Sequence, residues 1–394
     1  MATPQIAFVP GTHVARARHG EGSLSGLTFA AKDLFAIRGH TSSFGHPDWT
    51  RTHEPAAHNA PVVAQLLDAG ADLIGVTILD ELAFSLAGIN EFHGTPENPR
   101  AEGRLCGGSS CGSAAAVAAA LCDFALGTDT AGSVRVPAAF CGLFGIRSSQ
   151  GALSAEGVLP LAPSFDAVGF LARDAHTFHA VGKVLYGGEP PTQNLERVLI
   201  AEDAFTRNDA GVPEMLRDQL DRALAQLGVR AETIEIAPEG FPALAAAYNR
   251  LRMREIWQAL GGWYTQTAPK LSAPIDARMQ QCREVSANDD SLAEDLALRE
   301  QIRARIDALC APGVLLFLPP APGIAPRIDA SEQELATFRA RTVELSSLAA
   351  LSGAPQLVIP ARELDGAPLA LSFVARGGSD GWLCQLATRF DRAT

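Results

Sequence analysis

Residues 104–147 read RLCGGSSCGSAAAVAAALCDFALGTDTAGSVRVPAAFCGLFGIR. Glycines and small hydroxyl-bearing residues gather in two clusters of this stretch, Gly107–Ser113 and Thr128–Ser133. Between them, residues 112–122 are rich in alanine and carry no charge, which predicts a buried helix. Short strands are expected at 123–127 and 142–147, so this stretch indicates an α/β fold with two special turns.

The rest of the chain alternates short apolar runs with helical periodicity, which is typical of an α/β protein. Helices are predicted at 60–69, 80–87, 174–187, 212–228 and 291–310. Strands are predicted at 27–35, 72–78, 197–203 and 230–236, at the start of 314–326, and within 349–360 and 367–376. No repeat or long linker divides the chain, so we expect a single large domain over residues 1–394.

The composition excludes several classes of protein. With a formal net charge of −12 and a pI near 5.2, the chain is not expected to bind nucleic acid or an anionic membrane. It contains no apolar run of the roughly 18–20 residues needed to span a bilayer, and its N-terminus lacks the order of a secretory signal. Seven cysteines without a CxxC pair predict reduced core thiols in a cytoplasmic protein and no metal site.

The two glycine–serine clusters have three possible interpretations. A phosphate cradle is disfavoured, because the stretch has neither the lysine of a P-loop nor a GxGxxG pattern. A packing device remains possible, since glycine lets backbones approach closely. The third interpretation is an active site whose serines react without a histidine, because 104–147 contains none.

Lys32 favours the third interpretation. Of 32 basic residues only three are lysines, and Lys32 lies in the apolar run LTFAAKDLF. Burial favours the neutral amine, which can then accept a proton from a serine nucleophile. A second serine could relay that proton, and backbone amides of a tight turn could hold an oxyanion.

The pattern GGSSCGS, then an alanine-rich helix, then GTDTAGSVRVPAAFCG resembles the signature of the amidase signature family of serine amidohydrolases. FAAKDLF, LPLAPSFDAVGFLARD and SGAPQLVIP resemble further family segments, so the resemblance covers nearly the whole chain. It implies the amidase signature fold, an α/β domain with a central mixed β-sheet covered by helices on both faces. The signature core would lie at about 104–147.

The resemblance also implies roles for individual residues. Ser133 would be the nucleophile, Lys32 the general base, and Ser109 the bridging serine that follows a cis peptide bond. The oxyanion hole would consist of backbone amides of the turn Thr130, Ala131, Gly132 and Ser133. The turn departs from the family pattern at Ala131, where glycine is commoner.

Three neighbours of this triad would support it. Ser110 would hold the arrangement through hydrogen bonds, and Asp129 and Arg135 would be structural polar partners. No metal or organic cofactor is expected, and we expect a homodimer. The substrate pocket would be walled by residues near 83–94, 160–166 and 319–326.

The resemblance is closest to short plant-type amidases that hydrolyse indole-3-acetamide, which makes a small arylacetamide the first expected substrate. A small urea-type or malonamate-type amide is an alternative. A second class is an ammonia-delivering component of a tRNA-dependent amidotransferase, which would need a partner protein. A third, a catalytically silent binding protein, would be expected to have lost one of Lys32, Ser109 and Ser133, and all three are present.

Overall fold

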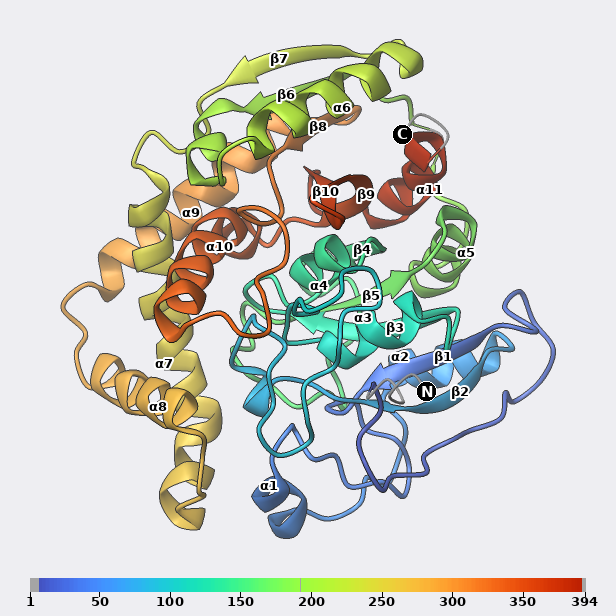
Figure 1. The fold of residues 1–394 in the computed structure, drawn as a ribbon, viewed down its shortest axis with the longest axis vertical. Helices are drawn as coiled ribbons and strands as arrows, with labels where there is room; N and C mark the ends of the chain where they lie inside the picture. The colour runs from blue at the N-terminus through green and yellow to red at the C-terminus, as the bar shows by residue number, and fades with distance from the viewer. Residues whose placement is uncertain (1–6, 192, 392–394) are drawn as a thin grey trace.

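The protein is described by a computed structural model that covers residues 7–191 and 193–391. Within these ranges the strands are β1 (Thr28–Lys32), β2 (Asp72–Thr77), β3 (Phe124–Asp129), β4 (Phe144–Arg147), β5 (Ala167–Ala172), β6 (Arg197–Ala201), β7 (Arg230–Ile234), β8 (Val314–Phe317), β9 (Gln356–Leu364) and β10 (Ala367–Val374). They form one mixed sheet in the order β2-β1-β3-β5-β4-β9-β10-β8-β6-β7 (Figure 1).

Helices surround this sheet (Figure 1). The α-helices are α1 (Pro47–Thr52), α2 (Pro61–Asp68), α3 (Cys111–Ala118), α4 (Arg135–Phe140), α5 (Ala175–Leu185), α6 (Val212–Leu227), α7 (Phe241–Thr267), α8 (Ala273–Ser286), α9 (Leu292–Leu309), α10 (Glu332–Ser352) and α11 (Asp380–Asp391). Two short 3-10 helices lie at Glu81–Ala83 and Glu202–Arg207. None of the described helices is long and apolar enough to span a membrane.

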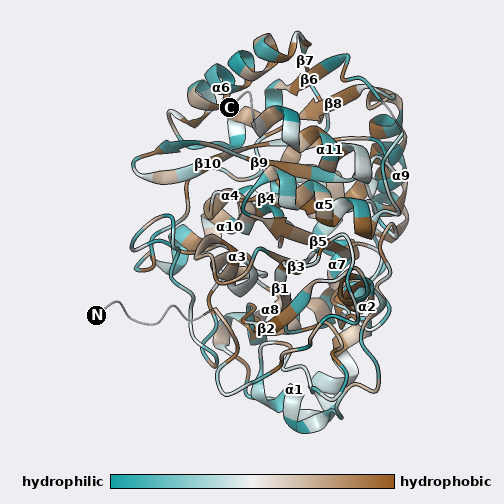
Figure 2. Cartoon of the chain, turned by 90° about the vertical axis from the view of Figure 1, so that its right-hand side faces the viewer, coloured by the Kyte–Doolittle hydropathy of each residue, from teal (hydrophilic) through white to brown (hydrophobic). Residues whose placement is uncertain are grey.

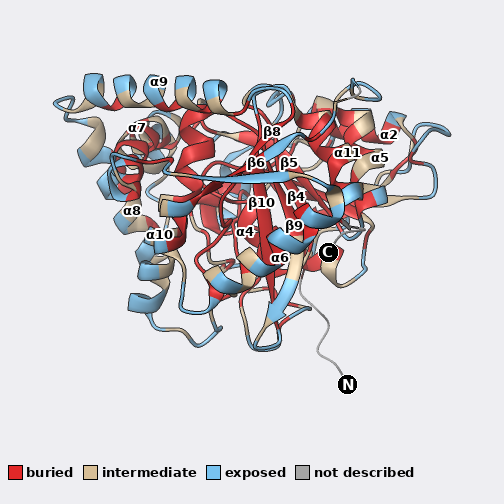
Figure 3. Cartoon of the chain, turned by 90° about the horizontal axis from the view of Figure 1, so that it is seen from above, coloured by how far each residue is buried: buried red, intermediate tan, exposed pale blue. Residues whose placement is uncertain are grey.

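Both faces of the sheet are covered, as the sequence predicts. In Figure 3, α2, α5 and α11 lie on one side of the buried strands, and α4, α7 and α10 lie on the other. Figure 2 shows apolar strands at the centre and hydrophilic residues on the outer side of α6. The amphipathic pattern of α6 therefore decides which of its faces meets the sheet.

The strand register brings Lys32 next to the second glycine–serine cluster. β1 is parallel to both β2 and β3, with Ala31 beside Leu126 in the β1–β3 pair. Parallel strands end at the same edge of a sheet, so Lys32 at the end of β1 lies beside Thr128 at the end of β3. This edge is where the site is built.

Most of the predicted elements are confirmed. The structure has strands within or overlapping every predicted strand segment, and α2, α5, α6 and α9 lie where helices are predicted. Pro61 begins α2, where a missing N–H costs nothing. The predicted helix at 112–122 is shorter, since α3 ends at Ala118 and Ala120 adopts a φ of 59°.

The predicted helix at 80–87 is wrong. Only one 3-10 turn forms there, because Leu82 and Ala83 have φ values of 51° and 56°, in the left-handed region that an α-helix excludes. The apolar residues of this segment suggest a helix because residues 80–84 are all buried. A buried loop is apolar for the same reason as a buried helix. The long helices α7 and α10 are not predicted, because they pack on several sides and lack one apolar stripe.

The cysteine prediction agrees with the structure. All seven cysteines are buried and free of disulfides. Burial raises the pKa of the Cys122, Cys282 and Cys310 thiols to about 12, so these three act as small apolar side chains.

Candidate active site

Lys32 is fully buried at the end of β1. Its Nζ lies 2.8 Å from Ser109 Oγ and 2.9 Å from Thr128 Oγ1. Burial lowers the pKa of Lys32 from 10.5 to about 8, although the negative charge of Asp80 opposes this shift. A neutral amine can donate a hydrogen bond to Thr128 and accept one from Ser109, which is the geometry that a general base needs.

The first serine cluster lies directly before α3. The peptide bond between Gly108 and Ser109 is cis, as the family resemblance implies. Ser110 donates its backbone N–H to the carbonyl of Ser133 at 3.2 Å and its hydroxyl to the carbonyl of Thr128 at 3.4 Å. Ser110 therefore joins the two serine clusters.

The second cluster is a tight turn between β3 and α4, organised by Asp129. The Asp129 carboxylate accepts hydrogen bonds from the backbone N–H groups of Gly132 (2.8 Å), Val134 (3.0 Å) and Arg135 (3.1 Å). The Arg135 guanidinium donates two more, from Nε at 2.9 Å and from Nη2 at 2.7 Å. Asp129 thus fixes the backbone on both sides of Ser133.

Asp129 remains ionised inside the protein. Burial alone would raise its pKa, but the guanidinium groups of Arg135 and Arg147 outweigh burial and hold the pKa well below its usual range. Arg147 also donates to the carbonyls of Asp129 and Phe165, and burial lowers its own pKa. A buried charge cluster of this kind persists only when its hydrogen bonds are made.

The amides of the turn 130–133 differ in their availability. The Gly132 N–H is already bonded to Asp129. Among the described residues, none accepts a hydrogen bond from the N–H of Thr130, Ala131 or Ser133. These three amides therefore remain as donors for a ligand oxygen.

Distant helices hold the carbonyls of the same turn. Tyr248 of α7 donates its hydroxyl to Thr130 O at 2.8 Å, and Ser346 of α10 donates to Ala131 O at 2.6 Å. Neither residue could be found from the sequence, because both lie more than 100 positions away in helices that it does not predict. The sequence analysis also did not predict Thr128 as a partner of Lys32. The signal available for it was its position in the GTD sequence of the second glycine–serine cluster.

Asp80 is a further buried group that the sequence did not single out. It follows β2 by three positions, its backbone N–H donates to Ser109 O at 3.2 Å, and its Oδ2 accepts from Gly88 N–H at 3.1 Å. Its Oδ1 has no hydrogen-bond partner among the described residues. Burial raises the pKa of Asp80 to about 6, and the nearby Lys32 limits that rise.

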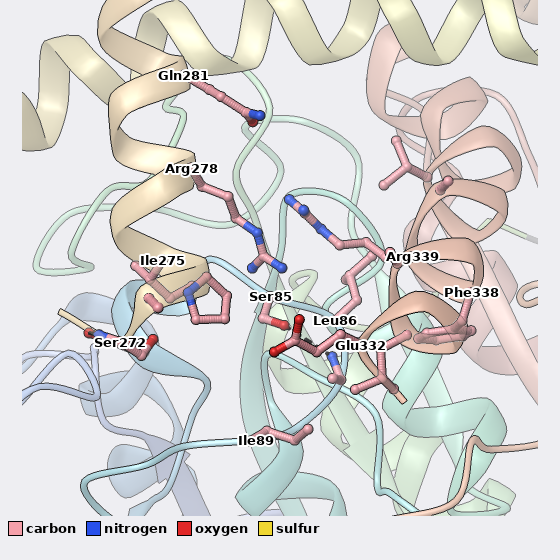
Figure 4. A pocket seen from close by; sticks show the side chains of 18 of the residues that line it. Ser85, Leu86, Ile89, Ser272, Ile275, Arg278, Gln281, Glu332, Phe338 and Arg339 are labelled. Atoms are coloured by element: carbon pink, nitrogen blue, oxygen red, sulfur yellow. Dashed lines mark hydrogen bonds between the residues drawn. The ribbon is translucent and has the colours of Figure 1, made fainter. Parts of the chain in front are cut away.

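The three residues of the predicted triad differ in exposure, at 0% for Lys32, 1% for Ser109 and 4% for Ser133. Ser133 is therefore the member nearest to solvent. A cavity of about 680 Å³ lies near the turn of Ser133, and Figure 4 shows side chains that line it, Leu86 among them. A methyl group built on Gly132 would lie 3.8 Å from Leu86 Cδ2, and Leu86 lines that cavity.

The lining of this cavity includes one of the three segments predicted to wall the substrate pocket. Ser85, Leu86, Ala87, Ile89 and Glu91 line it, as expected for segment 83–94. Residues of 160–166 and 319–326 do not line it, because α7, α8 and α10 close the other sides (Figure 4). Residues 322–326 instead border a separate cavity of about 590 Å³. Across the described ranges, no group of three or more His, Cys, Asp and Glu side chains is placed to hold a metal ion.

Comparison with known proteins identifies the family of this chain. The family model "Amidase" matches residues 11–384. The chain belongs to the amidase signature family. It is therefore an amide-hydrolysing enzyme, and the amidase fold expected from the signature motif is confirmed.

The amidase is similar to relatives of the same length. It is 37% identical to Amidase 1 of Arabidopsis thaliana over 92% of both chains. It is 39% identical to Amidase 1 of Oryza sativa subsp. japonica, over 94% of this chain and 92% of the relative. A crystal structure of an amidase superposes with a TM-score of 0.83 at 28% identity and covers 94% of this chain and 85% of that one.

Proposed function

We propose that the amidase cleaves a small amide through an acyl-enzyme on Ser133, with Lys32 as general base and Ser109 as the bridging serine. The observation that carries this proposal is the 2.8 Å contact of Lys32 Nζ with Ser109 Oγ in a fully buried site. Neutral Lys32 takes the proton of Ser109, and Ser109 takes the proton of Ser133. The Ser133 oxygen then attacks the amide carbonyl.

The remaining steps follow from the same groups. The free amides of Thr130, Ala131 and Ser133 stabilise the oxyanion of the tetrahedral intermediate. As the C–N bond breaks, the proton returns through Ser109 to the leaving nitrogen, which departs as ammonia or an amine. Water then attacks the ester, the acid is released, and Ser133 regains its proton. Ser110, Asp129 and Arg135 position the two serines without touching the substrate.

We propose a small arylacetamide such as indole-3-acetamide as the first substrate to test. The similarity to the two plant Amidase 1 proteins supports this choice, and the apolar side chains of Leu86, Ile89 and Met253 line the cavity. Small urea-type and malonamate-type amides are the alternative substrates.

The test is ammonia release from indole-3-acetamide, benzamide, malonamate, allophanate and glutamine. Ser133→Ala and Ser109→Ala should each lower turnover by about 10³-fold or more, because nucleophile and relay act as one unit. Ser113→Ala is the matched control, since Ser113 Oγ only bonds the Leu126 carbonyl at 2.9 Å and the Thr77 hydroxyl at 2.8 Å. Near-normal turnover of Ser133→Ala would overturn the mechanism.

A second candidate function has some support from similarity. The chain is 30% identical to a glutamyl-tRNA(Gln) amidotransferase component from Methanothermobacter thermautotrophicus, over 92% of this chain and 83% of the relative. That function requires glutamine as the amide and a partner protein. Hydrolysis of arylacetamides by the purified chain alone, with no activity on glutamine, would exclude it.

Three broader expectations belong to the same proposal. We propose that residues 1–394 act as one amidase domain, because strands from residue 28 to residue 374 share one sheet. We also propose a homodimer and a cytoplasmic location. Light scattering after size exclusion tests the first of these two, and cell fractionation tests the second.

A further inference from the structure

Three arginines from three helices line the 680 Å³ cavity: Arg252 of α7, Arg278 of α8 and Arg339 of α10. Figure 4 shows Arg278 and Arg339 pointing toward one another across it. All three guanidinium groups also gather around the buried ring of Phe84, at 5.7, 6.0 and 6.0 Å from its centroid. Three cations therefore converge on one small space.

Arg252 is buried and Arg278 and Arg339 are half-buried, yet all three lack the carboxylate partner that Arg135 and Arg147 have. Within the described residues, none of the three has a carboxylate oxygen within 4.0 Å, whereas Arg135 and Arg147 share Asp129. Arg252 is only 3% exposed, and its Nε has no hydrogen-bond partner.

The hydrogen bonds that the three arginines do make are few and neutral. Arg252 Nη2 donates to Asn249 Oδ1 at 2.7 Å, and Arg278 Nη1 donates to the Phe84 carbonyl at 2.6 Å. Most of the donors of the three guanidinium groups therefore stay available to a ligand.

Burial and the neighbouring cations together affect the pKa of two of these arginines. Burial lowers the pKa of Arg278 to about 10; the charge of Asp80 opposes this shift, that of Arg252 adds to it, and that of Glu81 opposes it. Burial lowers the pKa of Arg339 well below its usual range, with Arg278 and Arg252 as the next causes. An anion between these groups would remove both the repulsion and the unmet hydrogen bonds, because a guanidinium binds a carboxylate with two parallel N–H donors.

Acidic groups of the same cavity limit which anion fits. Glu81 accepts hydrogen bonds from the Ser272 backbone and hydroxyl, so it is already engaged. Glu91 and Glu332 line the cavity but are exposed to solvent. Three carboxylates near three guanidiniums favour a singly charged ligand group over a doubly charged phosphate.

The cavity also lies close to the turn 130–133, which holds Ser133. Leu86 lines it and lies beside Gly132, and its carbonyl accepts the N–H of Gly108 at 2.9 Å. Val343 lines it from α10, one helical turn before Ser346, which holds the Ala131 carbonyl. No residue of the 130–133 turn lines the cavity itself, so a substrate that spans from the arginines to Ser133 has to pass the side chains of Leu86 and Val343.

We infer that this cavity binds the carboxylate of the substrate, so that among the substrates proposed above the malonamate-type amides, with a free carboxylate at the end away from the scissile bond, are preferred over a neutral arylacetamide. The inference rests on the proposed function for the chemistry at Ser133. Neutral amides bind the apolar wall alone and react more slowly.

The kinetic test compares matched pairs of equal chain length: malonamate with propanamide, succinamate with butanamide, glutaramate with pentanamide, and adipamate with hexanamide. We expect kcat/KM for at least one carboxylate member to exceed that of its neutral partner by about tenfold or more. Arg339→Gln should remove most of this preference, by lowering kcat/KM for the carboxylate member at least about fivefold more than for its neutral partner. Preference for the neutral member in all four pairs, or equal losses for both members in Arg339→Gln, would overturn the inference.

A binding test separates this inference from the proposed function. Calorimetric titration of glutaramate and adipamate, with pentanamide and hexanamide as neutral ligands, uses the Ser133→Ala protein and needs no turnover. We expect the anionic ligands to bind about tenfold more tightly, with affinity that falls as salt increases. Arg339→Gln should abolish the difference, and Arg303→Gln on the exposed side of α9 should not. Equal affinities for both kinds of ligand in the Ser133→Ala protein would refute the anion site even if neutral amides are hydrolysed.

Thermal unfolding distinguishes a ligand site from a structural role. If the three arginines serve only to hold the helices together, Arg339→Gln should lower the melting temperature of the unliganded protein. If they form a site for an anion, the melting temperature should stay the same or rise, because a repulsive charge is removed. A fall in melting temperature together with unchanged carboxylate preference would overturn the proposal.

Discussion

The protonation of Lys32 should set the pH range of the amidase. A base must be neutral to accept a proton, so kcat/KM should rise about tenfold per pH unit below about pH 7 and level off above about pH 9. With a pKa of about 8, Lys32 is neutral in about one molecule in eleven at pH 7. At its ordinary pKa of 10.5 the fraction would be about one in three thousand, so burial gives a gain of roughly 300-fold.

Lys32→Arg tests this reasoning directly. A guanidinium keeps its proton, with an ordinary pKa above about 12, so we expect kcat/KM at pH 8 to fall by about four orders of magnitude. The assay is the initial rate of ammonia release between pH 5.5 and 9.5 at constant ionic strength, with circular dichroism to verify folding.

Lys183→Arg is the matched control for this variant. Lys183 lies on α5, where it is half-exposed and paired with Glu189. Its replacement should therefore leave kcat/KM and its pH profile unchanged. A flat wild-type profile between pH 6 and 9, or Lys32→Arg activity within tenfold of wild type, would refute the assignment of Lys32 as the base.

Three further predictions concern the groups around Lys32. Asp129→Asn should lower the free energy of unfolding by roughly 3–5 kcal/mol, measured by urea denaturation, because it leaves two buried arginines without their carboxylate; a loss below about 1 kcal/mol would contradict this. Gly108→Ala should abolish activity, since the added methyl would lie 2.3 Å from Asp80 Oδ2, whereas Gly262→Ala meets nothing within 4 Å and should be harmless. Asp80→Asn should move the midpoint of the kcat/KM profile to lower pH, because it removes the negative charge that raises the pKa of Lys32. An unmoved midpoint would leave Asp80 with a structural role alone.

The sequence indicated the candidate site residues where the local apolar pattern and the motif pointed to the same positions. The motif at 104–147 pointed to both serine clusters, and the apolar run around Lys32 indicated its burial. The structure places Lys32 and Ser109 within hydrogen-bonding distance and joins Ser110 to the Ser133 turn. The oxyanion prediction needs one change, because the Gly132 amide is taken by Asp129 and three amides remain.

The arginines of the 680 Å³ cavity could not be predicted in the same way. They lie at positions 252, 278 and 339, on three helices whose packing on several faces hides the usual apolar stripe. The predicted helix at 80–87 failed for a related reason, since a buried loop is as apolar as a buried helix and only the backbone angles distinguish them.

By itself, the sequence determined the class of fold, the family and the residue types available for chemistry, because these depend on local periodicity and on residues close together in the chain. Only the tertiary structure decided which distant groups meet. The parallel pairing of β1 with β3 places Lys32 beside Thr128, and the packing of α7 and α10 brings Tyr248 and Ser346 onto the turn 130–133. Such contacts arise from strand register and helix packing, which residue spacing along the chain does not encode.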